Sequence, residues 1–264
     1  MASLYLAEEI RGREEGDLQR IKLVFEYEGT RYHGLQVQEN AHTVQREMES
    51  AIHNLTGEWV KMLFAGRTDT GVHAVGQVGV FDSGSTIPAD RWAYALNSYL
   101  PEDVRVRSSE AAGADFHPRY QALSKTYRYL VYRSGAGQVF YRDRALCCRD
   151  TLDIEQMRKA AALFQGVHDF RAFCASGTSV KTFAREVYRC ELHEESPLLW
   201  LDIEANGFLY NMVRIIMGTL LEVGRGKLPA ERISQILDSL DRSQAGPTAP
   251  PQGLYLLKVN YPGG

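Results

Sequence analysis

The sequence contains little of what marks several large classes of protein. Only four of its 264 residues are cysteines, and none of them forms a C-x-x-C pair: Cys147, Cys148, Cys174 and Cys190. This usage argues against a disulfide framework and against a zinc site, and it favours reduced thiols in a cytosolic protein. The seven histidines form no cluster with the spacing of metal ligands. We therefore expect no metal site.

Long apolar runs and a secretion signal are also missing. No uninterrupted apolar stretch approaches the roughly 20 residues that a membrane-spanning helix needs. Residues 1–20 place acidic side chains directly after a very short apolar patch, which is not the pattern of a secretory signal. We expect this segment to be an extension, frayed or helical, on a cytoplasmic protein that does not bind membranes.

The chain has no strong charge of either sign, since its formal net charge is −3. The distribution is less even, because residues 115–149 carry seven basic against two acidic side chains, a balance of +5, together with seven aromatic residues. Basic and aromatic side chains together suit phosphate contact and base stacking. Arg119 and Lys125 are the candidates for substrate binding in this segment. An exposed strand with alternating arginine and tyrosine would give the same pattern.

Hydrophobic periodicity predicts one order of elements twice. In residues 21–112 it predicts strands at 21–29, 59–66, 75–82 and 104–110 and helices at 43–55 and 88–100. In residues 113–264 it predicts strands at 125–133, 185–195, 198–207 and 254–261 and helices at 153–166, 209–224 and 229–240. Each half follows the β-α-β-β-α-β order of ferredoxin-like folds, with one extra helix in the second. We expect an α+β protein whose two halves flank a central cleft.

One segment between two predicted strands, AGRTDTGVHAVGQV at residues 65–78, carries opposite charges close together. In an extended segment Arg67 and Asp69 would share a face, while Gly66 and Gly71 would permit tight backbone paths. Burial would raise the pKa of an unpaired carboxylate, and a nearby arginine would keep it anionic. Such an aspartate is a nucleophile or a general base. A turn with a surface ion pair is the plainer interpretation.

Three further residues stand out around this segment. Arg214 is the only charge in an apolar predicted helix, so it either extends to water or meets an anion, and Asp69 is the natural anion if Arg214 is buried. Tyr127 lies in a predicted strand, where a packing role and a role at the site both stay open. We interpret His73 as a structural residue that braces the loop, because its i, i+4 spacing from Asp69 would suit a metal only on a helix.

The triplet Asp69-Thr70-Gly71 also has the letters of the aspartic-protease motif. That chemistry requires two aspartates that share one proton, and the chain has no second Asp-Thr-Gly triplet. A hydrolase is therefore the weakest of three hypotheses. The second is a non-catalytic protein that binds or folds tRNA through the basic segment.

The leading hypothesis comes from a resemblance. The chain is similar to TruA-type tRNA pseudouridine synthases along essentially its whole length after about residue 20. The family's G-R-T-D-x-G-V-H-A signature is complete at residues 66–74. Further motifs follow in the family's order: FEYEGTRYHG, TVQREME, DFHPRY, KTYRY, NGFLYNMVRIIMGTLLEVG and AGPTAPPQGLYL. Leu35 and Val37 depart from the pattern, which weakens any assignment of RNA contacts to their loop.

The resemblance implies the pseudouridine synthase fold and the isomerisation of uridine to pseudouridine at positions 38, 39 and 40 of the tRNA anticodon stem-loop. It also implies homodimers that use no cofactor and no metal. By matching positions, Asp69 would be the nucleophile and Tyr127 would pack on the target base. Arg67 would orient the flipped nucleotide and Arg214 would pair with the aspartate. Leu254 would line the pocket.

Overall fold

A computed structural model describes residues 18–134, 138–177 and 180–263. The strands are β1 (Gln19–Tyr27), β2 (Leu63–Phe64), β3 (His73–Ser83), β4 (Val104–Ala111), β5 (Ser124–Tyr132), β6 (Leu146–Cys147), β7 (Gly166–Asp169), β8 (Ala184–Glu195), β9 (Leu198–Ala205) and β10 (Leu254–Asn260). The α-helices are α2 (Val44–Thr56), α3 (Trp92–Leu96), α4 (Ile154–Ala162), α5 (Met212–Gly224) and α6 (Arg232–Ser239). Most of the extension expected at residues 1–20 lies outside the described residues.

The strands form one ten-stranded sheet in the order β4-β1-β3-β10-β5-β9-β8-β7, with β2 beside β3 and β6 beside β5. The elements thus fall into two groups with the same arrangement, β4-β1-β3-β2 and β10-β5-β9-β8, which is the strand order of a ferredoxin-like fold. The predicted α+β class with two such halves is confirmed. The two sheets of the halves are continuous, because β3 and β10 pair in parallel at Tyr255 with His73 and Leu256 with Ala74.

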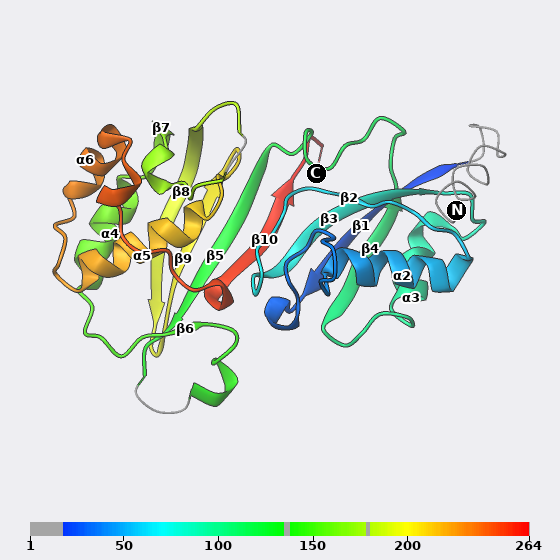
Figure 1. The fold of residues 1–264 in the computed structure, drawn as a ribbon, viewed down its shortest axis with the longest axis horizontal. Helices are drawn as coiled ribbons and strands as arrows, with labels where there is room; N and C mark the ends of the chain where they lie inside the picture. The colour runs from blue at the N-terminus through cyan, green and yellow to red at the C-terminus, as the bar shows by residue number, and fades with distance from the viewer. Residues whose placement is uncertain (1–17, 135–137, 178–179, 264) are drawn as a thin grey trace.

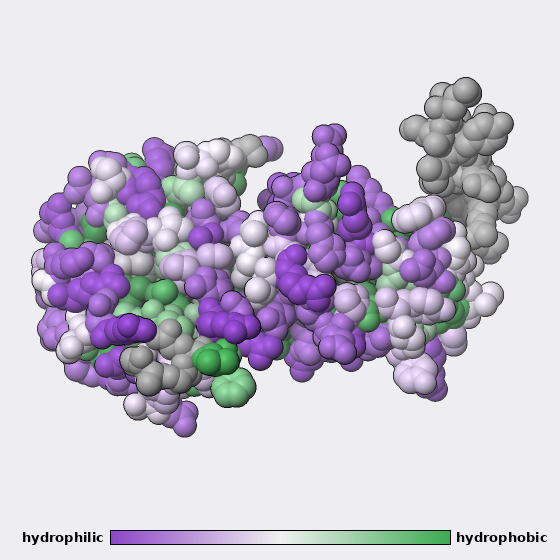
Figure 2. All heavy atoms as spheres, turned by 60° about the horizontal axis from the view of Figure 1, so that its bottom comes forward, coloured by the Kyte–Doolittle hydropathy of each residue, from purple (hydrophilic) through white to green (hydrophobic). Residues whose placement is uncertain are grey.

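The helices cover the two ends of this long sheet and leave its middle to loops. Figure 1 shows α2 and α3 beside the strands of the first half, and α4, α5 and α6 beside those of the second, with β10 and β5 between them. On the face drawn in Figure 2 hydrophilic side chains predominate, and apolar ones lie in small separate groups. The structural core is correspondingly internal, with α5 buried at nearly every position. In the described part of the chain no helix has the length and apolar character needed to cross a membrane.

Local sequence signals explain the helix α2. Thr43 caps it, accepting a hydrogen bond from the backbone N–H of Arg46. The helix ends at Gly57, whose left-handed φ of 78° favours glycine. Val44, Met48 and Ile52 recur at helical spacing and are fully buried. The prediction for residues 43–55 is therefore confirmed almost to the residue.

Three predicted elements are shorter than expected. The strand predicted at 59–66 is only β2, which pairs with β3 at Val80 and Gly79. The helix predicted at 88–100 is a 3-10 turn followed by α3, since the side chain of Asn97 bonds both backbone groups of Val106 in β4. The helix predicted at 153–166 ends at Ala162, and residues from Gly166 on form the unpredicted strand β7.

Candidate active site

A cleft of about 720 Å³ lies where the two halves meet. The loop between β2 and β3 contributes Gly66, Arg67, Thr68, Asp69 and Val72, strand β5 contributes Lys125 and Tyr127, and β10 contributes Leu254. The segment leading into α5 adds residues 208–213, and Arg119 comes from the connection between the halves. The sequence thus identified seven of the lining residues as candidates: Gly66, Arg67, Asp69, Arg119, Lys125, Tyr127 and Leu254.

Asp69 meets a cation from the opposite half of the molecule. Its Oδ2 lies 3.3 Å from Nη1 of Arg214, and the exposed fractions of the two side chains are 32% and 15%. Burial raises the pKa of Asp69, and the neighbouring Arg214 acts in the opposite direction. The contact expected between a buried Arg214 and Asp69 is therefore present.

Arg67 does not take part in this pair. Arg67 and Asp69 both line the cleft, as does Thr68, whose hydroxyl lies 2.7 Å from that of Tyr27. In the described structure, however, Arg67 has no ion pair with any carboxylate. The sequence-based idea that Asp69 is held anionic by its neighbour in the loop is wrong, because Arg214 takes that place.

Two carbonyl-type oxygens fix the guanidinium of Arg214. Its Nε donates to the backbone oxygen of Ala249 at 2.7 Å, and its Nη1 donates to Oδ1 of Asn211 at 2.6 Å. The backbone N–H of Ala249 bonds back to the carbonyl of Arg214 at 3.1 Å. The side chain is thereby aimed from α5 at the loop of Asp69.

The wall of the cleft beside Asp69 is apolar. Tyr127 is 8% exposed, and its ring lies edge-on to that of Phe208 with centroids 5.0 Å apart. Burial raises the pKa of Tyr127, so its phenol is neutral at physiological pH. Leu254 and Met212 are also buried and line the same cavity. Such a wall suits a flat base.

Three cations at the cleft have no carboxylate partner among the described residues: Arg67, Arg119 and Lys125. The Nζ of Lys125 donates to the carbonyl of Ala65 at 2.7 Å. Burial, together with the neighbouring cations Arg119 and Arg185, lowers the pKa of Lys125 to about 8. Unpaired cations at an open cavity are suited to phosphate groups.

The rest of the basic segment does not form such a surface. Four of its arginines are ion-paired, Arg128 with Asp202, Arg133 with Glu194, Arg142 with Asp143 and Arg144 with Glu28. Of its strand tyrosines, Tyr129 and Tyr132 are buried away from the cleft, and only Tyr127 lines it. Three of these partners, Asp202, Glu194 and Glu28, are distant in sequence and offset part of the +5 balance of residues 115–149.

His73 and Gly71 lie outside the cleft and support its loop. The Nδ1 of His73 accepts from the N–H of Gly29 at 3.0 Å, and Nε2 lies 3.1 Å from the carbonyl of Gln252. Burial lowers the pKa of His73, so the ring is neutral and can make both contacts. Gly71 has a φ of 77°, which favours glycine at this turn. These contacts agree with the structural parts expected for both residues.

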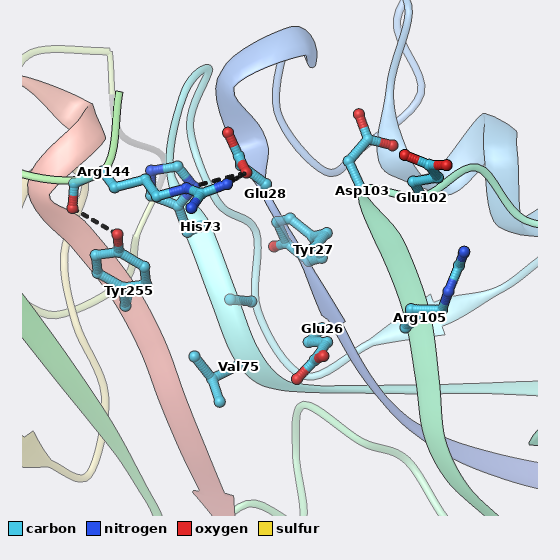
Figure 3. Close-up of a pocket in the computed structure, with 11 residues that line it drawn as sticks. Glu26, Tyr27, Glu28, His73, Val75, Glu102, Asp103, Arg105, Arg144 and Tyr255 are labelled. Carbon is cyan, nitrogen blue, oxygen red and sulfur yellow. Dashed lines mark hydrogen bonds and ion pairs between the residues drawn. The ribbon is translucent and has the colours of Figure 1, made fainter. Parts of the chain in front are cut away.

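A second, smaller cavity of about 250 Å³ adjoins His73 and shares no described lining residue with the first (Figure 3). Arg144 is ion-paired with Glu28 there, and Tyr255 donates to the carbonyl of Arg144. Four carboxylates and only two arginines line it: Glu26, Glu28, Glu102, Asp103, Arg105 and Arg144. This charge balance disfavours phosphate groups, and the larger cleft is the candidate site. Within the described ranges no three His, Cys, Asp or Glu side chains are grouped to hold a metal ion.

Sequence reasoning missed Phe208 and Asn211. Both lie in the motif NGFLYNMVR that carries Arg214, and Asn211 precedes Arg214 by one helical turn. That spacing was the available signal.

A single carboxylate held by an arginine, an apolar pocket for a base and unpaired cations at its mouth are the features of an enzyme that modifies nucleic acid. The chain belongs to the tRNA pseudouridine synthase family, whose sequence model matches residues 23–121 and 160–262. A relative from Syntrophomonas wolfei, called tRNA pseudouridine synthase A, is 58% identical over 245 residues, which cover 93% of this chain and 98% of the relative. Proteins of the same name from Acetivibrio thermocellus and Ruminiclostridium cellulolyticum are 50% and 46% identical, over 92% of this chain and 100% of each relative.

Proposed function

We propose that this protein isomerises uridine to pseudouridine at positions 38, 39 and 40 of the tRNA anticodon stem-loop, with Asp69 as the nucleophile. The observation that carries the proposal is the contact of Asp69, in the signature at residues 66–74, with Arg214 from the other half. The names of the relatives and the family support the reaction and the tRNA substrate.

The chemistry requires the N-glycosidic bond to break, the uracil to turn, and C5 to bond to C1′ of the same ribose. Attack by Asp69 on C6 of the base or on C1′ of the ribose requires an anionic oxygen, which the cation of Arg214 favours. The detached uracil must stay bound and water must stay out, and the apolar wall of Tyr127, Phe208 and Leu254 suits both requirements.

The target nucleotide must also leave its stack before a carboxylate can reach it. This costs a few kcal/mol, and less near a loop than within a long helix. Arg67 lines the cleft and has no carboxylate partner in the described structure, which supports a role in orienting the flipped nucleotide. Arg119 and Lys125 are suited to neighbouring phosphates.

We further infer, from the resemblance to the family, that the protein acts as a homodimer in the cytoplasm without a cofactor or a metal. Light scattering of the purified protein would measure the oligomeric state. A monomer that is fully active at every concentration would contradict the homodimer.

The experiment that tests the function incubates the protein with an unmodified tRNA transcript and maps pseudouridine by carbodiimide labelling. We expect product at positions 38 to 40 with the native protein and none with Asp69→Asn, which should still bind the tRNA. Asp82→Asn is the matched control, because Asp82 is ion-paired with Arg20 at the far end of β3 and should leave activity intact. Product formation by Asp69→Asn would exclude the proposed nucleophile. Tight tRNA binding without product from the native protein would favour a non-catalytic RNA-binding function, to which the unpaired cations also point.

A further inference from the structure

Asn211 adopts an unusual backbone conformation at the edge of the cleft. Its φ is 60°, in the left-handed region, and only Asn40 and Leu240 among the other described residues that are not glycine share a positive φ. Such a conformation is unfavourable for a residue with a side chain and persists where its surroundings hold it in place. Asn211 also lines the cleft that contains Asp69.

The side chain of Asn211 does not cap the helix that begins after it. Asn211 is the N-cap of α5, where an asparagine oxygen usually accepts a hydrogen bond from the backbone of the first turn. Here it makes no such bond. Its Oδ1 instead accepts from Nη1 of Arg214 at 2.6 Å.

The same nitrogen of Arg214 faces both Asn211 and Asp69. Nη1 lies 2.6 Å from Oδ1 of Asn211 and 3.3 Å from Oδ2 of Asp69. The shorter contact fixes the direction of the guanidinium, while the longer one leaves the carboxylate of Asp69 attracted but weakly hydrogen-bonded. The lone pairs of Asp69 thus stay available for attack.

The acceptors that orient Arg214 within its own half are uncharged. They are the side-chain amide of Asn211 and the backbone carbonyl of Ala249. An uncharged acceptor directs the guanidinium without neutralising it, so its positive charge acts on Asp69. An acid at position 211 would compete with Asp69 for the same cation.

We propose that Asn211 is a positioning residue for the isomerisation, whose side-chain oxygen holds Arg214 against Asp69. This inference rests on the proposed function, because it assigns Asn211 to the activation of the same nucleophile. The other charged or titratable side chains that line the cleft are Arg67 on the loop of Asp69, Lys125 and Tyr127 on β5, Arg119, and Tyr210 in the segment before α5. None of these bonds to the side chain of Arg214, whose partners are Ala249, Asp69 and Asn211, so they stay unchanged when Asn211 is replaced.

The decisive variant is Asn211→Gly, because glycine adopts a φ of 60° readily and lacks only the side chain. We expect kcat to fall roughly 10- to 100-fold, as for a catalytic group displaced by about 1 Å, while KM for tRNA stays within about twofold. The acid limb of the kcat profile should move to higher pH, because a misplaced Arg214 no longer opposes the raised pKa of Asp69. Asn211→Asp should show the same two changes, since its carboxylate competes for Arg214.

The matched control is Leu240→Gly, because Leu240 has a similar φ of 57° at the C-terminal end of α6, away from Asp69. It should leave kcat and its pH profile as in the native protein. Native kcat and an unchanged acid limb in Asn211→Gly would overturn the proposal, as would equal effects in the two glycine variants.

A readout without turnover separates this inference from the proposed function. Titration of the Asp69 carboxyl carbon by ¹³C NMR should give a higher pKa in Asn211→Gly than in the native protein. If that shift is seen but the native protein makes no pseudouridine, the positioning of Arg214 stands and the proposed reaction fails. An unchanged titration in an active enzyme would refute the positioning role alone.

Discussion

The two halves of the molecule have the same strand order but differ in the connection between their second and third strands. In the first half β2 and β3 are joined by residues 65–72, which include Asp69 and line the cleft. In the second half β8 and β9 are joined by the tight turn at Ser196 and Pro197. The two halves therefore share one scaffold, and a longer loop in the first half supplies the carboxylate.

The second helices of the two halves also differ, and here the second half has the longer element. In the first half α3 has five residues, whereas in the second half α5 has 13 and carries Arg214 near its start. One half therefore supplies the anion and the other the cation. The candidate site exists only because β3 and β10 pair and bring the two together.

The largest effect on turnover should come from removing the cation that the second half supplies, Arg214. We expect Arg214→Gln to lower kcat by about 10²- to 10³-fold, the loss seen when a charge-stabilising group is removed from an active site. Affinity for tRNA should change little, because Arg214 faces a carboxylate. The measurement is single-turnover pseudouridine formation together with a binding curve.

Arg214→Gln should also shift the pH dependence of activity in one direction. The active form of Asp69 is anionic, so activity is present above its pKa and is lost as the pH falls through it. Burial raises that pKa and Arg214 lowers it, so without Arg214 the loss should begin at a higher pH. Arg225→Gln, at the other end of α5 and paired with Asp150 and Glu222, is the control that should leave both rate and profile unchanged. A loss of tRNA affinity alone in Arg214→Gln would make Arg214 a phosphate contact.

In each half one glycine allows a backbone carbonyl near the site to approach closely. A Cβ at Gly29 would lie 2.0 Å from the carbonyl oxygen of Val72, and one at Gly218 would lie 1.7 Å from that of Pro247. We expect Gly29→Ala and Gly218→Ala each to lower the free energy of unfolding by about 3 kcal/mol, because neither backbone can yield easily. Urea denaturation measures this, with the exposed Gly113→Ala as the control within about 0.5 kcal/mol. A much larger loss in one half than in the other would mean that the halves are not equally rigid.

A smaller effect should separate the unpaired cations of the cleft from the paired ones elsewhere. Lys125 has a pKa of about 8, so it is cationic below that pH and loses its charge above it. We expect tRNA affinity to fall several-fold between about pH 7 and pH 9, and Lys125→Met to reduce the salt dependence of binding at pH 7 by about one counterion. Lys125→Arg should keep the affinity at high pH.

The paired lysine Lys22, which contacts Glu110 at 2.7 Å, provides the control for that experiment. Lys22→Met should leave the salt dependence unchanged. All binding is measured with Asp69→Asn present in the same chain, so that no turnover occurs. If the two lysine variants behave alike, the cleft cations have no special part in holding RNA.

The sequence was sufficient where local signals decide the structure. Helix α2 follows from its cap and its apolar spacing, and Asp69 follows from its motif. It was insufficient where segments distant in sequence meet, as when the parallel pairing of β3 with β10 joins the two halves into one sheet. For the same reason the charge of residues 115–149 was misleading, because partners such as Glu28 and Asp202 come from other elements.

The site was only partly predictable for a related reason. The lone charge in an apolar helix identified Arg214, but no pattern in the sequence gives the direction of its guanidinium. That direction depends on the left-handed conformation of Asn211 and on a carbonyl 35 residues away. The failure of Arg67 to pair with Asp69 has the same origin, since sharing a face does not bring two side chains into contact.

The smallest predicted effect compares one aspartate from each half by the sign of its pKa shift. Burial raises the pKa of Asp69, whereas a hydrogen bond from Arg225 lowers that of Asp150. An acid with a raised pKa in the folded state binds its proton more tightly there, so its ionisation costs stability at pH values above that pKa. The opposite holds for Asp150, whose ionised form stabilises the fold until the pH falls through its lowered pKa.

At pH 7 we therefore expect Asp69→Asn to raise the melting temperature by about 1–2 °C, although it abolishes activity, and Asp150→Asn to lower it. The difference for Asp69→Asn should vanish as the pH falls through the raised pKa of Asp69 toward the ordinary value of 3.8, because the carboxyl group is then protonated in the folded protein. The difference for Asp150→Asn should shrink only below 3.8, as the pH falls toward the lowered pKa of Asp150. Calorimetry at pH 7 and at the lowest pH where the fold persists measures the four differences. A lower melting temperature for Asp69→Asn at pH 7 would mean that Arg214 outweighs burial, and the carboxylate would then stabilise the cleft instead of being held there at a cost in stability.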